Sequence, residues 1–512
     1  MRGPHNLLRL VRTGATFERT GAMELVLDAF QAPPTLRLAA RTLGRPFRWL
    51  GYEGDPAMPP ATRALTALGP AYIKFGQILS TRPDVVGPEL ATQLRVLQDR
   101  LPPFPTSEAL ETVRRELDTD PDRLFSEFSE PVAAASIAQV HRARLRETGE
   151  EVAVKVLRPG IERAFRRDVD AFYLAARMVD LLAPGARRLR PLDVIRHFDG
   201  VVQGELDLRL EVSAGAEFAA NTARDEGFRL PKAHWFLSGR RVMTQGWVNG
   251  IPASDIAAIE AAGFDRHALG SRILQLFLKH ALRDGYFHAD MHQGNLKIGP
   301  AGDIVALDFG IMGRIDEYTR RVYAEILFGF IRKDYRRVAE LHFEAGYVPP
   351  DRDVDQFAQA LRSVAEPIFG MDATRISMGR LLNYLFEVTE RFGMQTRTEL
   401  ILLQRTMVVV EGVARSLNPQ INIWEVSRPV VEDYIRDHIG PRALASDLVR
   451  TARVLSRFGP RLPELAEAVL IRSQDPEPPG ALQGLAAAWR PAAWIALGAG
   501  LTALGVLIGA AL

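Results

Sequence analysis

The chain has 512 residues, of which 47% are hydrophobic and 25% charged, a composition that excludes a disordered or collagenous protein. The 64 basic and 62 acidic residues nearly cancel, so no strong overall field favours nucleic acid as a partner. The absence of cysteine excludes disulfides, thiolate metal sites and cysteine nucleophiles. Six of the 64 basic residues are lysines and the rest are arginines. Each lysine is therefore a candidate for a position that needs a compact ammonium group instead of a planar guanidinium.

The first fifty residues carry eight arginines against Glu18, Glu24 and Asp28. No apolar stretch of signal-peptide length follows the early arginines, so the segment is not a secretory signal. It is predicted to be a basic helical arm. The pattern favours a solvated arm over one that lies on a membrane surface.

The middle of the chain alternates between helical and strand-like patterns. In chain order we predict helices over 60–125 with a break at LPPFP (101–105), strands over 126–157 with a turn at 147–150, helices over 161–183 and about 191–222, strands from Arg229 to Val248, and helices from about 265 onward. A small mixed lobe before a larger helical lobe is an α+β pattern.

The strongest motif is FHADMHQGN at 287–295, which is followed by ALDFG. Asp290 and Asn295 have the spacing of a kinase catalytic loop, in which the aspartate orients or deprotonates the attacking hydroxyl and the asparagine binds a metal ion. Asp308 heads Asp-Phe-Gly, whose carboxylate holds Mg²⁺ across the nucleotide phosphates. The alternative, a polar turn before a β-hairpin, is disfavoured because the two motifs occur together at the right separation.

A second motif, EVAVKVLRPG at 151–160, places Lys155 in an alternating apolar strand. It matches the VAIK pattern, whose lysine grips the α- and β-phosphates and pairs with a glutamate on a helix. The segment ELDLRLE supplies the candidates Glu205, Asp207 and Glu211, of which the last two are four residues apart and share a helix face. The alternative is that all three are solvated helix charges.

Two features differ from a common protein kinase. The loop before the VAIK strand, PVAAASIAQVH at 131–141, has alanines in place of glycines, and alanine restricts φ and crowds the phosphates. A helix is predicted to start at about Asp316, almost directly after Asp-Phe-Gly, and no Ala-Pro-Glu follows it. The segment that docks a peptide substrate therefore has no room.

These motifs, together with YIKFGQILSTRPD at 72–84, resemble in order and content the UbiB family of atypical protein-kinase-like proteins, which are involved in ubiquinone (coenzyme Q) biosynthesis. The resemblance covers about 72–310. It implies a two-lobed, kinase-like α+β fold with an N-terminal helical extension. It also implies Mg²⁺-dependent ATPase activity with ATP or ADP as the nucleotide, responsive to membrane lipid, rather than peptide phosphorylation.

The resemblance implies a role for each motif. The KxGQ segment, with Lys74 and Gln77, lies over the active site and blocks protein substrates. Glu205 and Asp207 match the ExD motif of the family, and Glu211 matches the glutamate that pairs with the VAIK lysine. The predicted site residues are, as catalytic groups, Asp290, Lys155, Glu211 and Lys74; as nucleotide-binding groups, Ala133, Ala134, Ala135, Ser136, Lys155, Gln77, Glu205 and Asp207; and as metal ligands, Asn295 and Asp308.

Three positions depart from the family pattern. The usual HPGN reads HQGN at 292–295, which loses a rigid turn but no ligand. The hinge, expected to contain Met-Glu, reads MTQGW at 243–247, which weakens the expected contacts with the nucleotide base. Lys297 stands where relatives often have an apolar residue.

The last residues, from Pro491 to Leu512, carry no charge and would form a helix of roughly 30 Å, the hydrocarbon thickness of a bilayer. Trp489 and Trp494 stand where an interfacial belt would lie. We expect one transmembrane helix here, although relatives often show two. The alternative is a buried core helix.

The expected organisation has six parts. They are a basic helical arm (1–59), a KxGQ helical extension over the active site (60–125), a kinase-like N-lobe with inserted helices (126–250), a helical C-lobe with the catalytic loop and Asp-Phe-Gly (251–472), a linker (473–490) and a transmembrane tail (491–512). The expected location is the inner (cytoplasmic) membrane, with the kinase-like body in the cytoplasm. The expected partners are a nucleotide, membrane lipid, quinone precursors and other ubiquinone-biosynthesis proteins.

Two other functions stay open. A small-molecule phosphotransferase of the aminoglycoside or choline kinase type also has an HxDxxxxN loop, but it would lack the KxGQ segment and the membrane tail. A non-catalytic, nucleotide-binding scaffold of a membrane biosynthetic complex would have no need to keep Asp290, Asn295 and Asp308 together. The full set therefore favours an enzyme.

Overall fold

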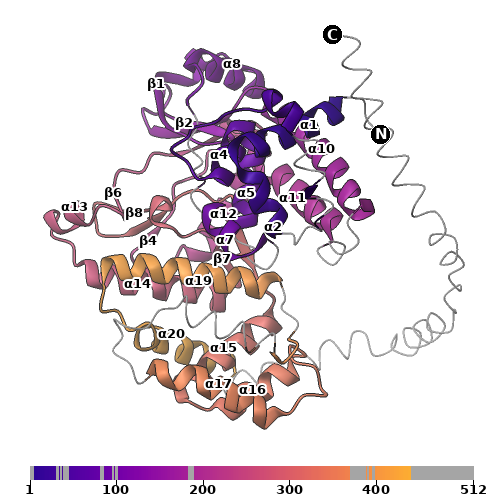
Figure 1. The fold of residues 1–512 in the computed structure, drawn as a ribbon. Helices are drawn as coiled ribbons and strands as arrows, with labels where there is room; N and C mark the ends of the chain where they lie inside the picture. Colours follow the sequence, from indigo (N-terminus) through magenta and orange to yellow (C-terminus); the bar gives the residue numbers. More distant parts are fainter. Residues whose placement is uncertain are drawn as a thin grey trace, which may run out of the picture. The chain divides into compact units, whose positions relative to one another are not determined.

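Most of the described residues belong to one compact unit. A computed structural model describes residues 5–29, 34, 37–38, 45–80, 86–94, 97, 102–182, 190–369, 388, 391–394 and 398–439 (Figure 1). Residues up to Arg436 belong to a single compact unit. The predicted linker and transmembrane tail lie outside the described residues. Among the residues that are described, no helix has the length and apolar character needed to cross a membrane.

An antiparallel sheet with the strand order β1-β2-β3-β5 forms the core of the N-lobe. Its strands and the short helices beside it are β1 (Phe125–Ala134), β2 (Ala138–Leu145), β3 (Glu151–Leu157), β5 (Val242–Gly246), α8 (Thr106–Leu117), α9 (Pro121–Leu124) and η3 (Trp235–Leu237). Val152, Val154 and Val156 alternate along β3 and are fully buried, where they pack with Ala109 and Val113 of α8. Every second side chain of β3 therefore points into the core.

Three helices are inserted between β3 and β5: α10 (Ile161–Leu182), α11 (Pro191–Glu205) and α12 (Leu208–Thr222). The region predicted to be helical over about 191–222 is divided into two helices, because the chain leaves helical geometry at Asp207 (φ −128°). The Asp207 carboxylate accepts a hydrogen bond from the backbone N–H of Arg209 and so caps α12. Leu206 is buried and continues the apolar pattern of the helix across the break. The spacing of apolar residues in the sequence therefore gives no sign of the break.

The N-terminal extension consists of α1 (His5–Thr20), α2 (Ala22–Ala29), η1 (Arg45–Leu50), α4 (Pro60–Leu68), α5 (Pro70–Ser80) and α7 (Pro88–Leu94). The first segment is helical, as predicted, but the expectation of a solvated arm is wrong. Helix α1 packs against α4 and α10. Its Thr13 hydroxyl lies 2.7 Å from the Tyr72 hydroxyl, and Arg9 forms an ion pair with Asp168. The extension is thereby fixed to the N-lobe helices.

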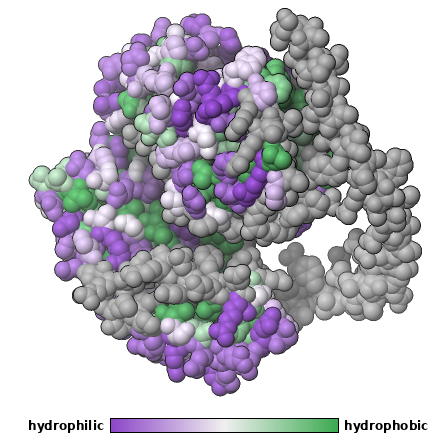
Figure 2. Space-filling model, viewed as in Figure 1, coloured by the Kyte–Doolittle hydropathy of each residue, from purple (hydrophilic) through white to green (hydrophobic). Residues whose placement is uncertain are grey.

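The C-lobe contains two small sheets, with the orders β4-β9-β8-β6 and β10-β7. Its elements are β4 (Phe228–Arg229), β6 (Ile251–Pro252), α13 (Ile256–Ala261), α14 (Arg266–Lys279), η4 (His280–Asp284), β7 (Tyr286–His288), η5 (Gln293–Asn295), β8 (Leu296–Ile298), β9 (Ile304–Ala306), β10 (Met312–Arg314), α15 (Glu317–Arg332), α16 (Tyr335–Glu344), α17 (Val354–Phe369), α19 (Thr398–Leu417) and α20 (Ile423–His438). Helices α14 and α19 lie side by side (Figure 1). On the face shown in Figure 2, hydrophilic residues cover much of the N-lobe and of the α15–α17 region.

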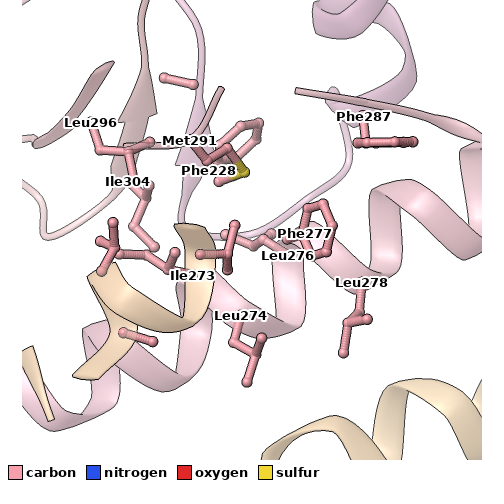
Figure 3. Packing of buried hydrophobic residues seen from close by; sticks show 14 of the residues in the cluster. Phe228, Ile273, Leu274, Leu276, Phe277, Leu278, Phe287, Met291, Leu296 and Ile304 are labelled. Atoms are coloured by element: carbon pink, nitrogen blue, oxygen red, sulfur yellow. The ribbon is translucent and has the colours of Figure 1, made fainter. Parts of the chain in front are cut away.

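The core of the C-lobe also anchors the catalytic loop. Ile273 and Phe277 of α14 pack in one buried cluster with Met291 and Leu296 (Figure 3). Met291 is 1% exposed, whereas the neighbouring Asp290 is partly exposed. Burial of a large apolar side chain contributes about 1.5–3 kcal/mol, so the core fixes the loop at the residue next to Asp290.

Candidate active site

Lys155 stands at the centre of the site, on β3, opposite Met243 of β5. Its Nζ lies 2.8 and 2.9 Å from the two carboxylate oxygens of Glu211 on α12, and 3.4 Å from Oδ2 of Asp308. Of the three acidic candidates in ELDLRLE, Glu211 is therefore the one that contacts the lysine. Glu211 is 8% exposed, whereas the Asp308 side chain is half-exposed.

The charges of this cluster depend on one another. Burial lowers the pKa of Lys155, but the carboxylates of Asp308 and Glu211 outweigh that effect, so the pKa lies above its usual value. The Lys155 ammonium in turn lowers the pKa of Asp308 to about 2. At neutral pH Lys155 and Asp308 are both charged, whereas burial raises the pKa of Glu211. The half-exposed, ionised carboxylate of Asp308 is therefore the group of this cluster that suits a cation.

The catalytic loop is held by hydrogen bonds of its own. The Asn295 side-chain N–H donates to the backbone carbonyl of Asp290 at 3.0 Å. The imidazole Nδ1 of His292 accepts from the backbone N–H of Gly294 at 3.0 Å and so caps η5. The other ring nitrogen, Nε2, lies 3.6 Å from Oδ2 of Asp290. The loop thus holds the Asp290 carboxylate near one edge of the His292 ring.

The backbone brings the two predicted magnesium ligands, Asn295 and Asp308, near each other. The backbone N–H of Leu307 donates to the carbonyl of Asn295 at 2.8 Å, which places Asn295 beside the residue that precedes Asp308. Because the Asn295 amide nitrogen is used by Asp290, the side-chain oxygen is the atom left for a metal. No cluster of three or more acidic or histidine side chains suited to a metal occurs in the described ranges. Mg²⁺ with nucleotide is ordinarily held by one or two protein side chains plus phosphate oxygens, which matches this pair.

His288 connects the catalytic loop to the strand before Asp-Phe-Gly. Its Nε2–H donates to the carbonyl of Leu307 at 3.0 Å, and its Nδ1 accepts from the N–H of Asp290 at 3.1 Å. Burial lowers the pKa of His288, so the ring is neutral with the proton on Nε2. The buried imidazole therefore joins the two motifs, in addition to the backbone hydrogen bond between Leu307 and Asn295.

Phe309 packs against α12, the helix that carries Glu211. A Cβ on Gly215 would lie 2.6 Å from Cδ2 of Phe309, so the close approach requires glycine. Phe218 of α12 and His288 also lie against the Phe309 ring. The contact holds α12 in the position in which Glu211 reaches Lys155.

The alanine-rich loop joins β1 to β2, with Ala133 paired to Val140 and Ala134 to Gln139. Ala133 is exposed, and Ala134 and Ala135 are half-buried. Ser136 is 2% exposed. The alanines of this loop therefore reach the surface, whereas the serine side chain does not.

The KxGQ segment lies on α5. Lys74 Nζ is 2.8 Å from Oε1 of Glu205, the last residue of α11. The Gln77 amide donates to the backbone carbonyl of Leu97 at 3.5 Å. Asp207 is paired with Arg209, whose Nη2 lies 2.6 Å from Oδ2. Of the two acidic residues of the ExD motif, Glu205 is thus the partner of Lys74.

Lys297, the unusual residue after the catalytic loop, contacts the hinge. Its Nζ donates to the carbonyl of Val248 at 3.1 Å and lies 5.5 Å from the centre of the Trp247 ring. A cation over an indole face is favourable. Lys297 therefore fixes the end of the MTQGW segment instead of filling an apolar position.

Comparison with known proteins identifies the domains of the chain. Residues 96–342 match a family described as the ABC1 atypical kinase-like domain, and residues 361–422 match the UbiB helical domain. The chain is 38% identical over 474 residues to a protein of Aeromonas hydrophila named probable protein kinase UbiB, covering 91% of this chain and 86% of that protein. The chain belongs to the UbiB family of ABC1 atypical kinase-like proteins.

Two further comparisons agree. A protein of Marinobacter nauticus, also named probable protein kinase UbiB, is 39% identical over 420 residues, covering 81% of this chain and 77% of that protein. Among solved structures, Rv3197 of Mycobacterium tuberculosis, in complex with erythromycin, has a TM-score of 0.52 at 24% identity. It covers 77% of this chain and 97% of its own length, and it supports the fold alone.

The UbiB helical domain contributes to the site through α19, which the sequence argument missed. The Thr406 hydroxyl donates to the carbonyl of Ala289 at 3.1 Å, and the Gln293 amide donates to the Ser416 hydroxyl at 2.6 Å. Gln293 therefore replaces the rigid turn of HPGN with a bond to another helix. Arg405, the residue before Thr406, has a pKa that desolvation lowers and that the nearby Asp290 carboxylate raises, with desolvation the larger effect. The sequence feature that could have indicated this contact is the arginine inside the mostly apolar run LILLQRTMVVV.

Proposed function

We propose that this UbiB-type protein binds Mg-nucleotide at the Lys155 cluster and hydrolyses ATP in support of ubiquinone biosynthesis at a membrane. The observation that carries the proposal is the simultaneous contact of Lys155 with Glu211 and with Asp308. In kinases the lysine–glutamate pair and the metal-binding aspartate must both be in place before phosphoryl transfer. The contacts of Lys155 with Glu211 and with Asp308 support the same arrangement here.

Each residue then has a chemical task. Lys155 would bind the α- and β-phosphates, and Asn295 and Asp308 would hold Mg²⁺. Mg²⁺, when bound, neutralises charge on the phosphate oxygens. Asp290 would orient the attacking water or hydroxyl, with His288 fixing the backbone from which it projects. Phosphoryl transfer requires little more than such positioning and charge neutralisation.

The path of the chain after Asp-Phe-Gly argues against a peptide substrate. Gly310 is followed by the short strand β10 and then by α15, which begins at Glu317 with Asp316 as its cap. The sequence predicted this early helix start, and it leaves little chain for an activation segment. A short connection equally suits a small-molecule phosphotransferase. The Lys74–Glu205 pair and the family membership favour the UbiB activity over that second candidate.

ATP hydrolysis by the full chain tests the proposal. We would measure phosphate release with Mg²⁺ or EDTA, with and without vesicles of anionic lipid, and then with quinone precursors. The account predicts Mg²⁺-dependent hydrolysis that rises with lipid. Hydrolysis that appears only with an added small-molecule acceptor would favour the phosphotransferase. Nucleotide binding without hydrolysis under every condition would favour the scaffold.

Membrane attachment through the C-terminal segment is the remaining part of the proposal. Its support is the uncharged run from Pro491 to Leu512. A chain without residues 485–512 should stay folded and should no longer sediment with membranes. If the folded truncated chain still sediments, the basic N-terminal segment is the anchor instead. Aggregation of the truncated chain would indicate a core helix.

A further inference from the structure

Arg158, immediately after β3, makes an unusual contact with the alanine-rich loop. Its Nε and Nη2 both donate to the carbonyl of Ala135, at 3.1 and 3.0 Å. Its backbone N–H donates to the carbonyl of Ile137 at 2.8 Å. The side chain is partly buried, and burial lowers the pKa of Arg158. A guanidinium placed in this setting needs acceptors, and the loop backbone provides one.

Phe104 supports the guanidinium from the other side. The Arg158 Cζ lies 5.6 Å from the centre of the Phe104 ring. Phe104 belongs to the LPPFP break between α7 and α8, and Gln139 of β2 holds its backbone in both directions. The Phe104 N–H donates to the Gln139 side-chain oxygen at 3.0 Å, and the Gln139 amide donates to the Phe104 carbonyl at 3.1 Å.

Gln139 is fixed by a second partner. Its side chain is fully buried, and its amide nitrogen also lies 2.9 Å from Nε2 of His141. The other ring nitrogen, Nδ1, donates to the carbonyl of Ser129 at 2.8 Å, so Nε2 accepts from Gln139. Both amide hydrogens of Gln139 are thereby used, and its orientation is determined. Burial lowers the pKa of His141, which keeps this neutral form.

These contacts surround the tip of the loop. The N–H of Ala135 donates to the carbonyl of Ala138 at 2.8 Å, while its own carbonyl is held by Arg158. We propose that Arg158, supported by Phe104 and Gln139, is a positioning residue that fixes the alanine-rich loop beside the nucleotide site before nucleotide binds. The proposal rests on the nucleotide-binding function proposed above. We call the three residues the loop clamp.

The clamp and the alanines both restrict the motion of the loop. A glycine-rich loop is free to adjust to the phosphates, whereas alanine restricts the backbone and the clamp holds the carbonyl at the tip. A loop that is ordered beforehand loses little entropy when the nucleotide binds. Releasing the clamp should therefore increase loop motion and weaken nucleotide binding, while the Lys155–Glu211 contact stays intact.

Hydrogen exchange of the full chain tests the clamp without nucleotide. We would compare the parent with Arg158→Met, Arg158→Lys and the control Arg146→Met. Arg146 also donates to backbone carbonyls, those of Asp122 and Phe125 at 2.6 and 3.2 Å, but at the opposite end of the β1–β2 hairpin. We expect amide exchange over 133–138 to accelerate at least tenfold in Arg158→Met, less in Arg158→Lys, and not in Arg146→Met. ADP affinity should fall at least threefold in Arg158→Met only.

Parent-like exchange over 133–138 in Arg158→Met would overturn the proposal, and so would equal acceleration in Arg146→Met. If Arg158→Met does not fold, Phe104→Leu removes the ring under the guanidinium and keeps the backbone hydrogen bonds, and the same local acceleration is expected. The loop clamp and the proposed nucleotide-binding function can be refuted independently of each other. A parent protein that binds no ADP would refute the proposed function, while the exchange of the nucleotide-free chain would still decide whether the clamp exists.

Discussion

Lys74 and Glu205 form an ion pair that joins the N-terminal extension to the helices of the N-lobe, with 2.8 Å between Nζ and Oε1. Both side chains are mostly buried, at 16% and 12% exposure. Glu205 ends α11, and two residues later Asp207 caps the helix that carries Glu211. The KxGQ helix is thus linked through one short break to the residue that contacts Lys155.

Substitution of Lys74 should change catalysis without unfolding the protein. Arginine keeps the charge, but its wider planar group does not fit the position of a compact ammonium beside Glu205. We expect Lys74→Arg to fold normally and to alter ATP hydrolysis about tenfold, about 1.4 kcal/mol in activation free energy, with or without lipid. The control is Lys333→Arg. Lys333 forms an ion pair with Glu366, and both residues belong to the C-lobe. Parent-like kinetics in both Lys74→Arg and Lys74→Ala would refute a role for the KxGQ helix in the site.

A glycine in the alanine-rich loop should shift nucleotide binding. Ala133 is exposed on the strand before the loop tip, so Ala133→Gly removes a methyl group from the surface of the loop. Without this methyl group the phosphates can come closer to the loop, while Arg158 still holds the loop tip, and we expect higher ATP affinity or new autophosphorylation. Titration calorimetry and phosphorylation assays measure the two effects. If neither changes in Ala133→Gly, Ala134→Gly or Ala135→Gly, the loop has no inhibitory role.

The sequence predicted the parts of the site that lie within contiguous motifs. Lys155, Asp290, Asn295 and Asp308 are identifiable because their chemistry requires fixed local spacing. The break at Asp207 was missed because an apolar residue continues the helical period across it. The contacts of α1 and α19 were missed for a different reason, since they join segments that are distant in the chain and carry no local signal.

Arg405 offers a test of the contribution of α19. Thr406 fixes this part of α19 to the backbone just before Asp290, and the Asp290 carboxylate acts electrostatically on the neighbouring Arg405. A permanent cation there would stabilise negative charge on a transferred phosphoryl group. We expect Arg405→Gln to lower ATP turnover at least tenfold and to leave ADP affinity unchanged. The control is Arg336→Gln, on the exposed face of α16. Equal turnover in both variants would mean that Arg405 is a surface residue with no role in ATP hydrolysis.

Buried histidines should make stability depend on pH. Burial lowers the pKa of four of them: His141, His280, His288 and His342. In the unfolded chain they titrate near pH 6.5, so below that pH the unfolded state binds more protons than the folded state. Stability should therefore fall as the pH falls from 7.5 to 5.5, by up to about 1.4 kcal/mol per pH unit for each histidine.

Denaturant unfolding at the two pH values measures this effect. The variant His342→Gln removes one of these groups from a helix of the C-lobe, away from the candidate site. Its stability should depend less steeply on pH than that of the parent. An identical pH dependence would mean that folding does not lower the pKa of His342.

Mg-ATP binding by Asp308→Asn tests the central claim most directly. Asp308 combines a half-exposed carboxylate, a contact with Lys155 and a pKa of about 2, so it is charged at any working pH. The control is Asp303→Asn, which removes the same charge from the preceding hairpin, where Asp303 is paired with Arg229. The account predicts that Asp308→Asn folds, loses Mg²⁺-dependent ATP binding and hydrolyses ATP about 10²–10³ times more slowly, a loss of about 2.7–4 kcal/mol, while Asp303→Asn keeps its Mg²⁺ dependence. Parent-like Mg-ATP binding and hydrolysis by Asp308→Asn would contradict it.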